Sequence, residues 1–528
     1  MLSLSDIPAE LCEEIFSHLI KAAHLASVAR VCKVFHDYAM PILYEQIYIY
    51  HWHGDSKARV VKLFNTLSKF PQLAAYLRKL VVTDPPKLVA VDHAEDLFVR
   101  GLRNCKALRA CSWTRDGALT SGILETLQYC PALTSLEING RSEYKYRADL
   151  LLGFRRLEEL TIVMPDAGVI RHMEAWFGHT GQTLRRLTLI CKASPLVNDE
   201  TLKAWAPHLA NLEHFSLVGC PKVTHQSIWA VISGNTHGIR SLGLEGLSPR
   251  FDLVALNTLC SRSPTHTLAH LSSITLTIGP MMPAERFADD ALALLANCPL
   301  ERAHVYSTGK IIGAPVLSKV STPASSAKPT ARSHTANASN LLGNALHSCS
   351  TTASSSTNHI PFSSTPAFPS FIDTFSFPSA SLTDSFCLRL TALHSARLTR
   401  LAAYKMVLSL RAVDVICTGC PALEQLFVVV DRGDMATIAT SLAKAPRLRS
   451  VHINYPQDVR TGPLDVQDIE AQVVPRCGPM LRQFGCNTKV WQVERRIERA
   501  SDGTDEIRAH LGPYERLEVP EQFLVVRA

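Results

Sequence analysis

The chain has 528 residues, of which 46% are hydrophobic and 19% are charged, and its formal net charge is +7. This composition is typical of a globular protein, and so modest a charge does not favour nucleic-acid binding, which depends on clustered Lys and Arg. The sequence holds no run of eighteen apolar residues, so we expect neither a membrane span nor a membrane partner.

The amino-terminal stretch is acidic and lacks the basic region of a secretory signal. The 15 cysteines are spaced irregularly, which favours reduced thiols rather than a disulfide framework. Both features predict a location in the cytoplasm and/or the nucleus.

Residues 3–48 show two amphipathic helical patterns. In "DIPAELCEEIFSHLI", Leu11, Ile15 and Leu19 recur at helical spacing. In "HLASVARVCKVFHDYAMPILYEQI" a second apolar stripe includes Leu25, Val28, Cys32, Phe35 and Ala39, and we expect Pro41 to break the helix. Three short helical pieces are too small to stabilise a core well, so this segment is expected to bury apolar surface against a partner.

A leucine-rich pattern, L-x-x-L-x-L with conservative replacements, organises the rest of the chain. The four steps from Leu133 to Ile239 are 24, 27, 28 and 27 residues, a spacing typical of leucine-rich repeats. The pattern begins at Leu77, Leu108, Leu133, Leu157, Leu184, Leu212, Ile239, Leu271, Leu300, Ile372, Leu398, Leu423, Leu448 and, weakly, Leu481.

Each repeat predicts one strand and one helix. The L-x-L core alternates with period two, which predicts a short strand with one buried face. The intervening stretches have helical spacing: "DETLKAW" follows Asp199, a plausible cap, and "DDALALLANC" follows Asp289 or Asp290. Because one such unit cannot bury its own apolar face, the units must stack, and we predict a curved parallel α/β solenoid rather than a doubly wound sheet.

Residues 309–370 interrupt the repeats. They are rich in Ser, Thr, Ala and Pro, a composition that predicts disorder. The segment is interpreted as a regulatory loop, an inert insertion or sequence wrongly retained in the gene model. The predicted organisation is therefore 3–48, a helical module; 49–308, first repeats; 309–370, insert; 371–487, second repeats; and 488–528, a carboxy-terminal cap or tail.

Two further features carry weaker chemical signals. Cys417 and Cys420 form a C-x-x-C pair, which suggests a redox or zinc site, but Cys420 precedes Leu423 as Cys130 precedes Leu133, which favours a structural repeat position. The group around Arg495 and Arg496 alternates with glutamates and is interpreted as a solvated helix face. No nucleophile, zinc-protease or phosphate-binding motif occurs, so enzyme function is the weaker class, and no catalytic residue, metal or cofactor is expected.

The amino-terminal module resembles an F-box. The matching steps are Ile7-Pro8, Glu10-Leu11, Ile15-Phe16, Val31-Cys32 and Leu43-Tyr44, and the chain has Phe35 where the family often has Trp. An F-box followed by leucine-rich repeats is more specific than either part. The alternative is that the first helix only caps the solenoid.

The resemblance implies a substrate-recognition subunit of an SCF-type ubiquitin ligase. The F-box would dock on the Skp adaptor, which joins cullin and RING subunits, while the repeats would bind the protein to be ubiquitinated; a scaffold that acts without ubiquitin transfer is the alternative. The residues implied in adaptor binding are Ile7, Pro8, Leu11, Ile15, Phe16, Leu19, Val28, Val31, Cys32, Phe35 and Leu43.

The strand alternation also predicts a substrate site. Side chains between the buried strand positions should face the concave side of the solenoid. There Glu137, Thr161, Thr188, Ser216, Gly243 and Thr275 are mostly small and neutral. Because exposed aromatic and Arg side chains dominate binding sites, we predict that the substrate contacts a carboxy-terminal group consisting of Arg302, His304, Arg400, Phe427 and His452. The alternative is that a neighbouring loop or the tail covers Phe427.

Overall fold

The computed structural model describes residues 8–19, 21–51, 53, 55–83, 85, 94–262, 267–278, 284–307, 380–430, 435–455, 466–499 and 504–516. Residues 1–312 and 376–528 belong to one compact unit, which contains all of these. The predicted insert at 309–370 and the repeat at Ile372 lie outside the described residues.

The amino-terminal module consists of three helices: α1 (Ala9–Ser17), α2 (Ala22–Val28) and α3 (Lys33–Glu45). They share a small core in which the rings of Phe16 and Phe35 meet edge to face, with centroids 5.2 Å apart. The expected break at Pro41 is wrong, because Pro41 lies inside α3. An internal proline costs a helix about 3 kcal/mol, and burial of Phe35 and Ala39 on this helix offsets that cost.

The repeats build a single sheet whose strand order follows the chain from β1 to β16. In the described residues, every strand from β2 to β14 begins two residues after the first position of its leucine-rich pattern. The strands are β1 (Gln46–Ile49), β2 (Lys79–Val82), β3 (Ala110–Trp113), β4 (Ser135–Asn139), β5 (Glu159–Val163), β6 (Arg186–Ile190), β7 (His214–Val218), β8 (Ser241–Glu245), β9 (Ser273–Ile278), β10 (Arg302–Ser307), β11 (Arg400–Leu408), β12 (Gln425–Val430), β13 (Ser450–Asn454), β14 (Gln483–Cys486), β15 (Lys489–Arg499) and β16 (Asp505–Pro513).

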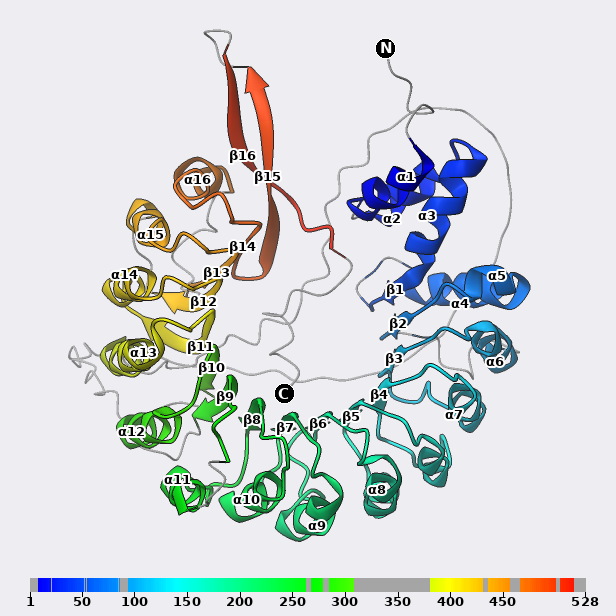
Figure 1. The fold of residues 1–528 in the computed structure, drawn as a ribbon, viewed down its shortest axis with the longest axis horizontal. Coiled ribbons are helices and arrows are strands. Elements are labelled where there is room, and N and C mark those ends of the chain that lie inside the picture. The colour runs from blue at the N-terminus through cyan, green and yellow to red at the C-terminus, as the bar shows by residue number, and fades with distance from the viewer. Residues whose placement is uncertain are drawn as a thin grey trace, which may run out of the picture. The chain divides into compact units, whose positions relative to one another are not determined.

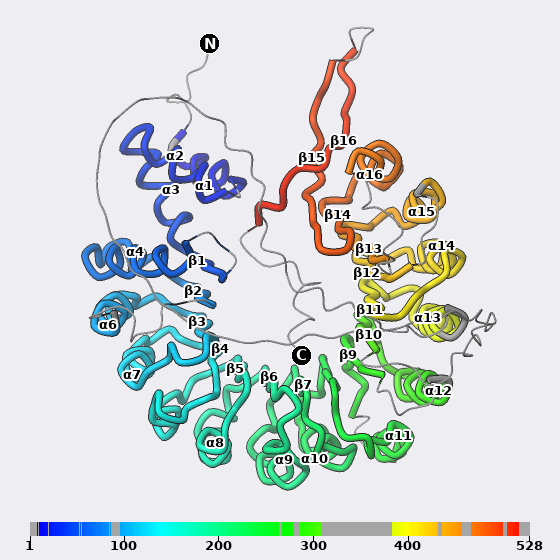
Figure 2. The backbone as a smooth tube through the Cα atoms, turned by 180° about the vertical axis from the view of Figure 1, so that it is seen from behind, coloured from blue at the N-terminus to red at the C-terminus, as the bar shows by residue number. Residues whose placement is uncertain are grey.

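Helices and short 3-10 turns connect these strands and lie on the outer side of the arc, while the strands line its inner side (Figures 1 and 2). The connecting elements are α4 (Ser56–Lys69), α5 (Pro71–Ala74), α6 (Ala94–Asn104), α7 (Ser121–Gln128), η3 (Ala148–Gly153), α8 (Ala167–Thr180), α9 (Asp199–Trp205), η4 (Ala206–His208), α10 (His225–Ser233), α11 (Leu253–Arg262), α12 (Ala284–Leu295), α13 (Ala380–His394), α14 (Leu410–Gly419), α15 (Met435–Leu442) and α16 (Val466–Gln472). The predicted α/β solenoid of parallel strands is confirmed.

Strand alternation sets the core as predicted. In β4, Leu136 and Ile138 are buried between sheet and helices, whereas Glu137 points to the inner side. The parallel register then places Glu137 beside Thr161, and Thr161 beside Thr188. Equivalent residues of successive repeats therefore form continuous rows along the inner face.

Two predicted helix starts differ from the structure. The cap of α9 is Asn198, whose side chain accepts from the amide of Thr201 in a capping box. Asp199 instead accepts from Thr224 and Ser227 of the next repeat, at 2.7 and 2.6 Å. Helix α12 begins at Ala284, so Asp289 and Asp290 lie within it rather than at its start.

The sheet ends in an antiparallel hairpin made of β15 and β16. The interpretation of Arg495 and Arg496 as a helix face is wrong, because both lie in β15. Arg495 donates to the carbonyls of Leu481 and Gly478, at 2.9 and 3.1 Å, and so ties the hairpin to the last repeat.

Candidate functional site

The helical module carries apolar side chains on its surface. Leu11 and Ile15, one turn apart on α1, are 51% and 41% exposed, and Val31 and Val34 are 67% and 47% exposed. Their neighbours Cys12 and Phe16 fill the core of the module. We name the four exposed apolar residues Leu11, Ile15, Val31 and Val34 the module surface.

The structure divides the eleven residues implied in adaptor binding. Phe16 and Phe35 are buried in the module core, so they stabilise the module rather than forming part of its surface. Leu19, Val28 and Leu43 pack against that core and are partly buried. Pro8, Leu11, Ile15, Val31 and Cys32 are exposed, and Ile7 lies outside the described residues.

Val34 was missed by the sequence reasoning, because it belongs to neither apolar stripe. It lies in the first turn of α3 and is exposed, whereas its neighbour Phe35 is buried. Three charged residues of α1, Glu10, Glu13 and Glu14, are also exposed. The module therefore presents apolar contacts beside acidic groups.

The predicted substrate residues lie on the inner face, as strand alternation requires. Arg302 pairs with Arg400 in neighbouring strands, and Phe427 pairs with His452. His304 pairs with Ala402, which in turn pairs with Phe427. The carboxy-terminal group is therefore brought together in space, and its assignment to substrate binding stays a prediction.

The expected exposure of Phe427 is wrong, because the residue is only 2% exposed. The guanidinium of Arg400 lies 5.0 Å from the centre of its ring, and the rings of Tyr404 and His452 each lie 6.4 Å from it. Arg400 and His452 are buried too, whereas Arg302 is exposed. Strand alternation correctly predicted the face on which Phe427 lies but not its exposure, because large side chains of the neighbouring strands surround its ring.

Burial also changes the charge of this group. It lowers the pKa of His304 to about 3, assisted by Arg400 and Arg302, and it lowers the pKa of His452 to about 4. The Nε2 atom of His452 lies 2.9 Å from the Asn487 carbonyl oxygen. Both histidines are therefore neutral near pH 7, and the positive charge of the carboxy-terminal group resides on its two arginines.

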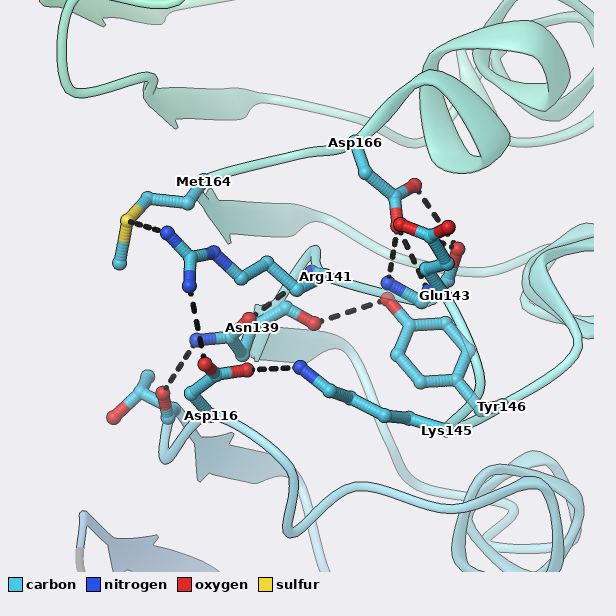
Figure 3. A network of polar contacts seen from close by, with 10 residues as sticks. Asp116, Asn139, Arg141, Glu143, Lys145, Tyr146, Met164 and Asp166 are labelled. Carbon is cyan, nitrogen blue, oxygen red and sulfur yellow. Dashed lines mark hydrogen bonds and ion pairs between the residues drawn. The ribbon is translucent and has the colours of Figure 1, made fainter.

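A second candidate surface is the loop of residues 140–147, between β4 and η3. Asp116 binds both Arg141, at 3.1 Å, and Lys145 (Figure 3). The loop conformation is thus fixed from one side by a carboxylate that follows β3. Hydrogen bonding from Lys145, with the charges of Lys145 and Arg141, holds the pKa of Asp116 below its usual value.

Asp166 fixes the same loop from the other side. Its carboxylate accepts from the amides of Ser142 and Glu143 at 2.6 and 2.9 Å, which orders the loop (Figure 3). It also accepts from the amide of Val169 at 2.9 Å and so caps α8. Burial alone would raise the pKa of Asp166, but these donors hold it below its usual value.

This ordered loop presents Tyr144, which is 98% exposed and has a left-handed backbone with φ of 58°. A non-glycine residue in that conformation is uncommon, and a fully exposed tyrosine on an ordered loop is a ready contact for a partner. The sequence reasoning missed Tyr144, because no repeat position or motif marks it.

Cys417 and Cys420 occupy core positions in the structure. Both are buried and neither forms a disulfide, and burial raises the pKa of the Cys417 thiol to about 12 and that of Cys420 to about 11. The equivalent Cys130 donates its thiol to the Thr126 carbonyl in the preceding helical turn. These thiols are therefore packing residues of the repeat.

The described residues contain neither a metal-binding cluster nor a membrane-spanning helix. No group of three or more His, Cys, Asp or Glu side chains could hold a metal ion in this part of the chain. Likewise, no helix of the described ranges is long and apolar enough to cross a membrane.

Comparison with known proteins identifies the module. No curated protein matches this sequence. Among solved structures, an internalin from Listeria monocytogenes aligns with 76% of this chain and 91% of its own, at 9% identity and a TM-score of 0.24, a similarity too low to carry an argument. Residues 4–50 match the family described as F-box-like, so the helical module is an F-box-like domain placed ahead of a leucine-rich-repeat type solenoid.

Proposed function

We propose that this protein is the substrate-recognition subunit of an SCF-type ubiquitin ligase. The observation that carries the proposal is the F-box-like domain at residues 4–50, with an exposed module surface, joined directly to a solenoid of parallel strands. A domain of this kind followed by repeats is typical of non-catalytic binding proteins.

The module surface would bind the Skp adaptor. Docking removes Leu11, Ile15, Val31 and Val34 from water, which is favourable in proportion to the apolar area buried. The buried Phe16 and Phe35 would hold α1 against α3, so that the exposed residues keep their spacing.

Through the adaptor the chain would join cullin and RING subunits, which are proposed partners. Ubiquitin transfer belongs to those other subunits, and this chain contributes proximity and orientation of the bound protein. The proposed location is the cytoplasm and/or the nucleus.

The carboxy-terminal group stays one proposed contact for the protein substrate, and the loop of residues 140–147 is a second, through Tyr144. This residue is exposed, aromatic and held by an ordered loop, which lowers the entropic cost of binding. The matched control is Tyr129 at the end of α7, which is 78% exposed but lies outside that loop. Tyr144→Ala should reduce substrate capture while Tyr129→Ala leaves it unchanged, scored by affinity purification with ubiquitination blocked downstream.

Co-purification tests the proposal as a whole. The full chain should capture the Skp adaptor together with a cullin and should support ubiquitination of a captured protein in a reconstituted reaction. Capture of the adaptor without cullin would instead favour a scaffold that acts without ubiquitin transfer. Failure to capture the adaptor at all would overturn both interpretations.

A further inference from the structure

The β15–β16 hairpin leaves the sheet with an open edge. Within the described residues β16 pairs only with β15, and in Figure 1 the hairpin extends past α16. Residues 505–508 of β16 are exposed, and so are residues 495–497 of β15. A two-stranded ribbon that is solvated on both faces is marginally stable by itself, and an open strand edge is a template for pairing.

Hydrogen bonds at the base of the hairpin determine which backbone groups point outward. The amide of Leu511 donates to Glu470 at 3.0 Å, and the amide of its partner Val493 donates to the Arg482 carbonyl at 2.8 Å. Val493 and Leu511 therefore do not exchange hydrogen bonds. Since bonded and non-bonded pairs alternate along an antiparallel ladder, the backbone groups of Ile507, four residues away, also face outward.

The contact with Glu470 also limits the open edge. It occupies the outward amide of Leu511, so the available stretch is the outer part of β16, residues 505–509. Ile507 is the central residue of that stretch. If a second strand paired with β16 about a two-fold axis through Ile507, all of residues 505–509 would be paired, with residue 505 opposite residue 509 of the second strand.

The side chains of this stretch are self-complementary about the same residue. In the hairpin Ile497 faces Ile507, and these residues are 74% and 69% exposed. Arg496 stands directly opposite Arg508, and Glu498 directly opposite Glu506. Like charges in directly opposed positions are destabilising. Within the hairpin they are compensated along each strand, where Arg508 pairs with Glu506 at 3.1 Å and Arg496 with Glu494 at 2.7 Å, and diagonally, where Arg508 lies 3.9 Å from Glu498.

We propose that β16 pairs antiparallel with β16 of a second copy of this chain, about a two-fold axis at Ile507. In this register Arg508 faces Glu506 of the partner subunit, and Glu506 faces the partner's Arg508. Ile507 meets the partner's Ile507, so that four isoleucines form one continuous row. The pairing satisfies the outward backbone groups and places opposite charges beside both like-charge pairs.

The interface is small, so the dimer is weak and depends on concentration. Sedimentation velocity on the full chain, over roughly 1–100 µM, should show a monomer–dimer equilibrium. In the proposed dimer, residue 506 of each copy faces residue 508 of the other. Either single variant, Glu506→Arg or Arg508→Glu, therefore places like charges opposite one another at both of these positions, and should raise the dimer Kd about tenfold or more. The matched control is Arg262→Glu, which reverses the charge of an exposed residue on α11 and should leave the Kd unchanged.

Mixing the two single variants is the decisive measurement. One variant then presents Arg at 506 and 508 and the other presents Glu at both, so the mixture should dimerise at concentrations at which each variant alone stays monomeric. This restoration also shows that both variants are folded. A monomeric parent chain, dimers that persist in both variants, a mixture that stays monomeric, or larger head-to-tail species formed on the opposite sheet edge at β1 would each overturn the proposal.

Discussion

Truncation of the module surface should weaken adaptor binding without unfolding the chain. Full burial of a Leu or Ile side chain contributes about 1.5–3 kcal/mol. Leu11 is 51% and Ile15 41% exposed, so docking can remove only about half of each from water, or about 1 kcal/mol per residue. The double variant Leu11→Ala/Ile15→Ala should therefore raise the Kd for the Skp adaptor about 30-fold.

Calorimetric titration of the full chain with purified adaptor measures this change. Leu11→Glu should abolish binding, because an ionised carboxylate in an apolar interface costs several kcal/mol more. Val415 on α14 is the control: it is 47% exposed but belongs to the solenoid, so Val415→Ala and Val415→Glu should leave the Kd unchanged. A double variant that binds within about twofold of the parent, with the same thermal midpoint, would show that α1 does not contact the adaptor.

Three further outcomes are expected. Asp199→Ala removes the carboxylate that accepts from the hydroxyl groups of Thr224 and Ser227, and should lower the free energy of unfolding in urea by about 1–3 kcal/mol; an unchanged midpoint would contradict the inter-repeat role. His452 has its pKa lowered to about 4, so below pH 6.5 the unfolded chain binds a proton that the folded chain does not, and stability should fall by about 2 kcal/mol from pH 7 to pH 5. His452→Asn should remove that share of the pH dependence, and an identical slope in the variant would refute it. Excision of residues 315–366, which lie outside the described residues, should leave the thermal midpoint unchanged because low-complexity sequence adds little burial, whereas a large drop would show that the insert packs against the solenoid.

The sequence by itself determined the architecture. The pattern that begins at Leu133 places β4 two residues later, and alternation sends Leu136 to the core and Glu137 to the inner face. These are local properties, because side-chain period and repeat length depend only on neighbouring residues. The F-box-like module could be predicted for the same reason, since its apolar positions follow helical spacing within a short segment.

Other features depended on contacts between distant residues. Asp199 resembles a cap in the sequence, yet in the structure it bonds to Thr224 and Ser227 of the next repeat, 25 and 28 residues away. The segment around Arg495 is strand rather than helix, because Arg495 and Arg496 pair with Ala509 and Arg508 of β16. Neither partner is visible in a local window of sequence.

Exposure was likewise decided by tertiary structure. Alternation places Phe427 on the inner face, but packing beside Arg400, Tyr404 and His452 buries it. By contrast, Tyr144 occupies no repeat position and is fully exposed, because Asp166 and its neighbours fix the loop that carries it. A strand pattern specifies the direction in which a side chain points. Its solvent exposure depends on the side chains of neighbouring strands, which only the folded structure brings into register.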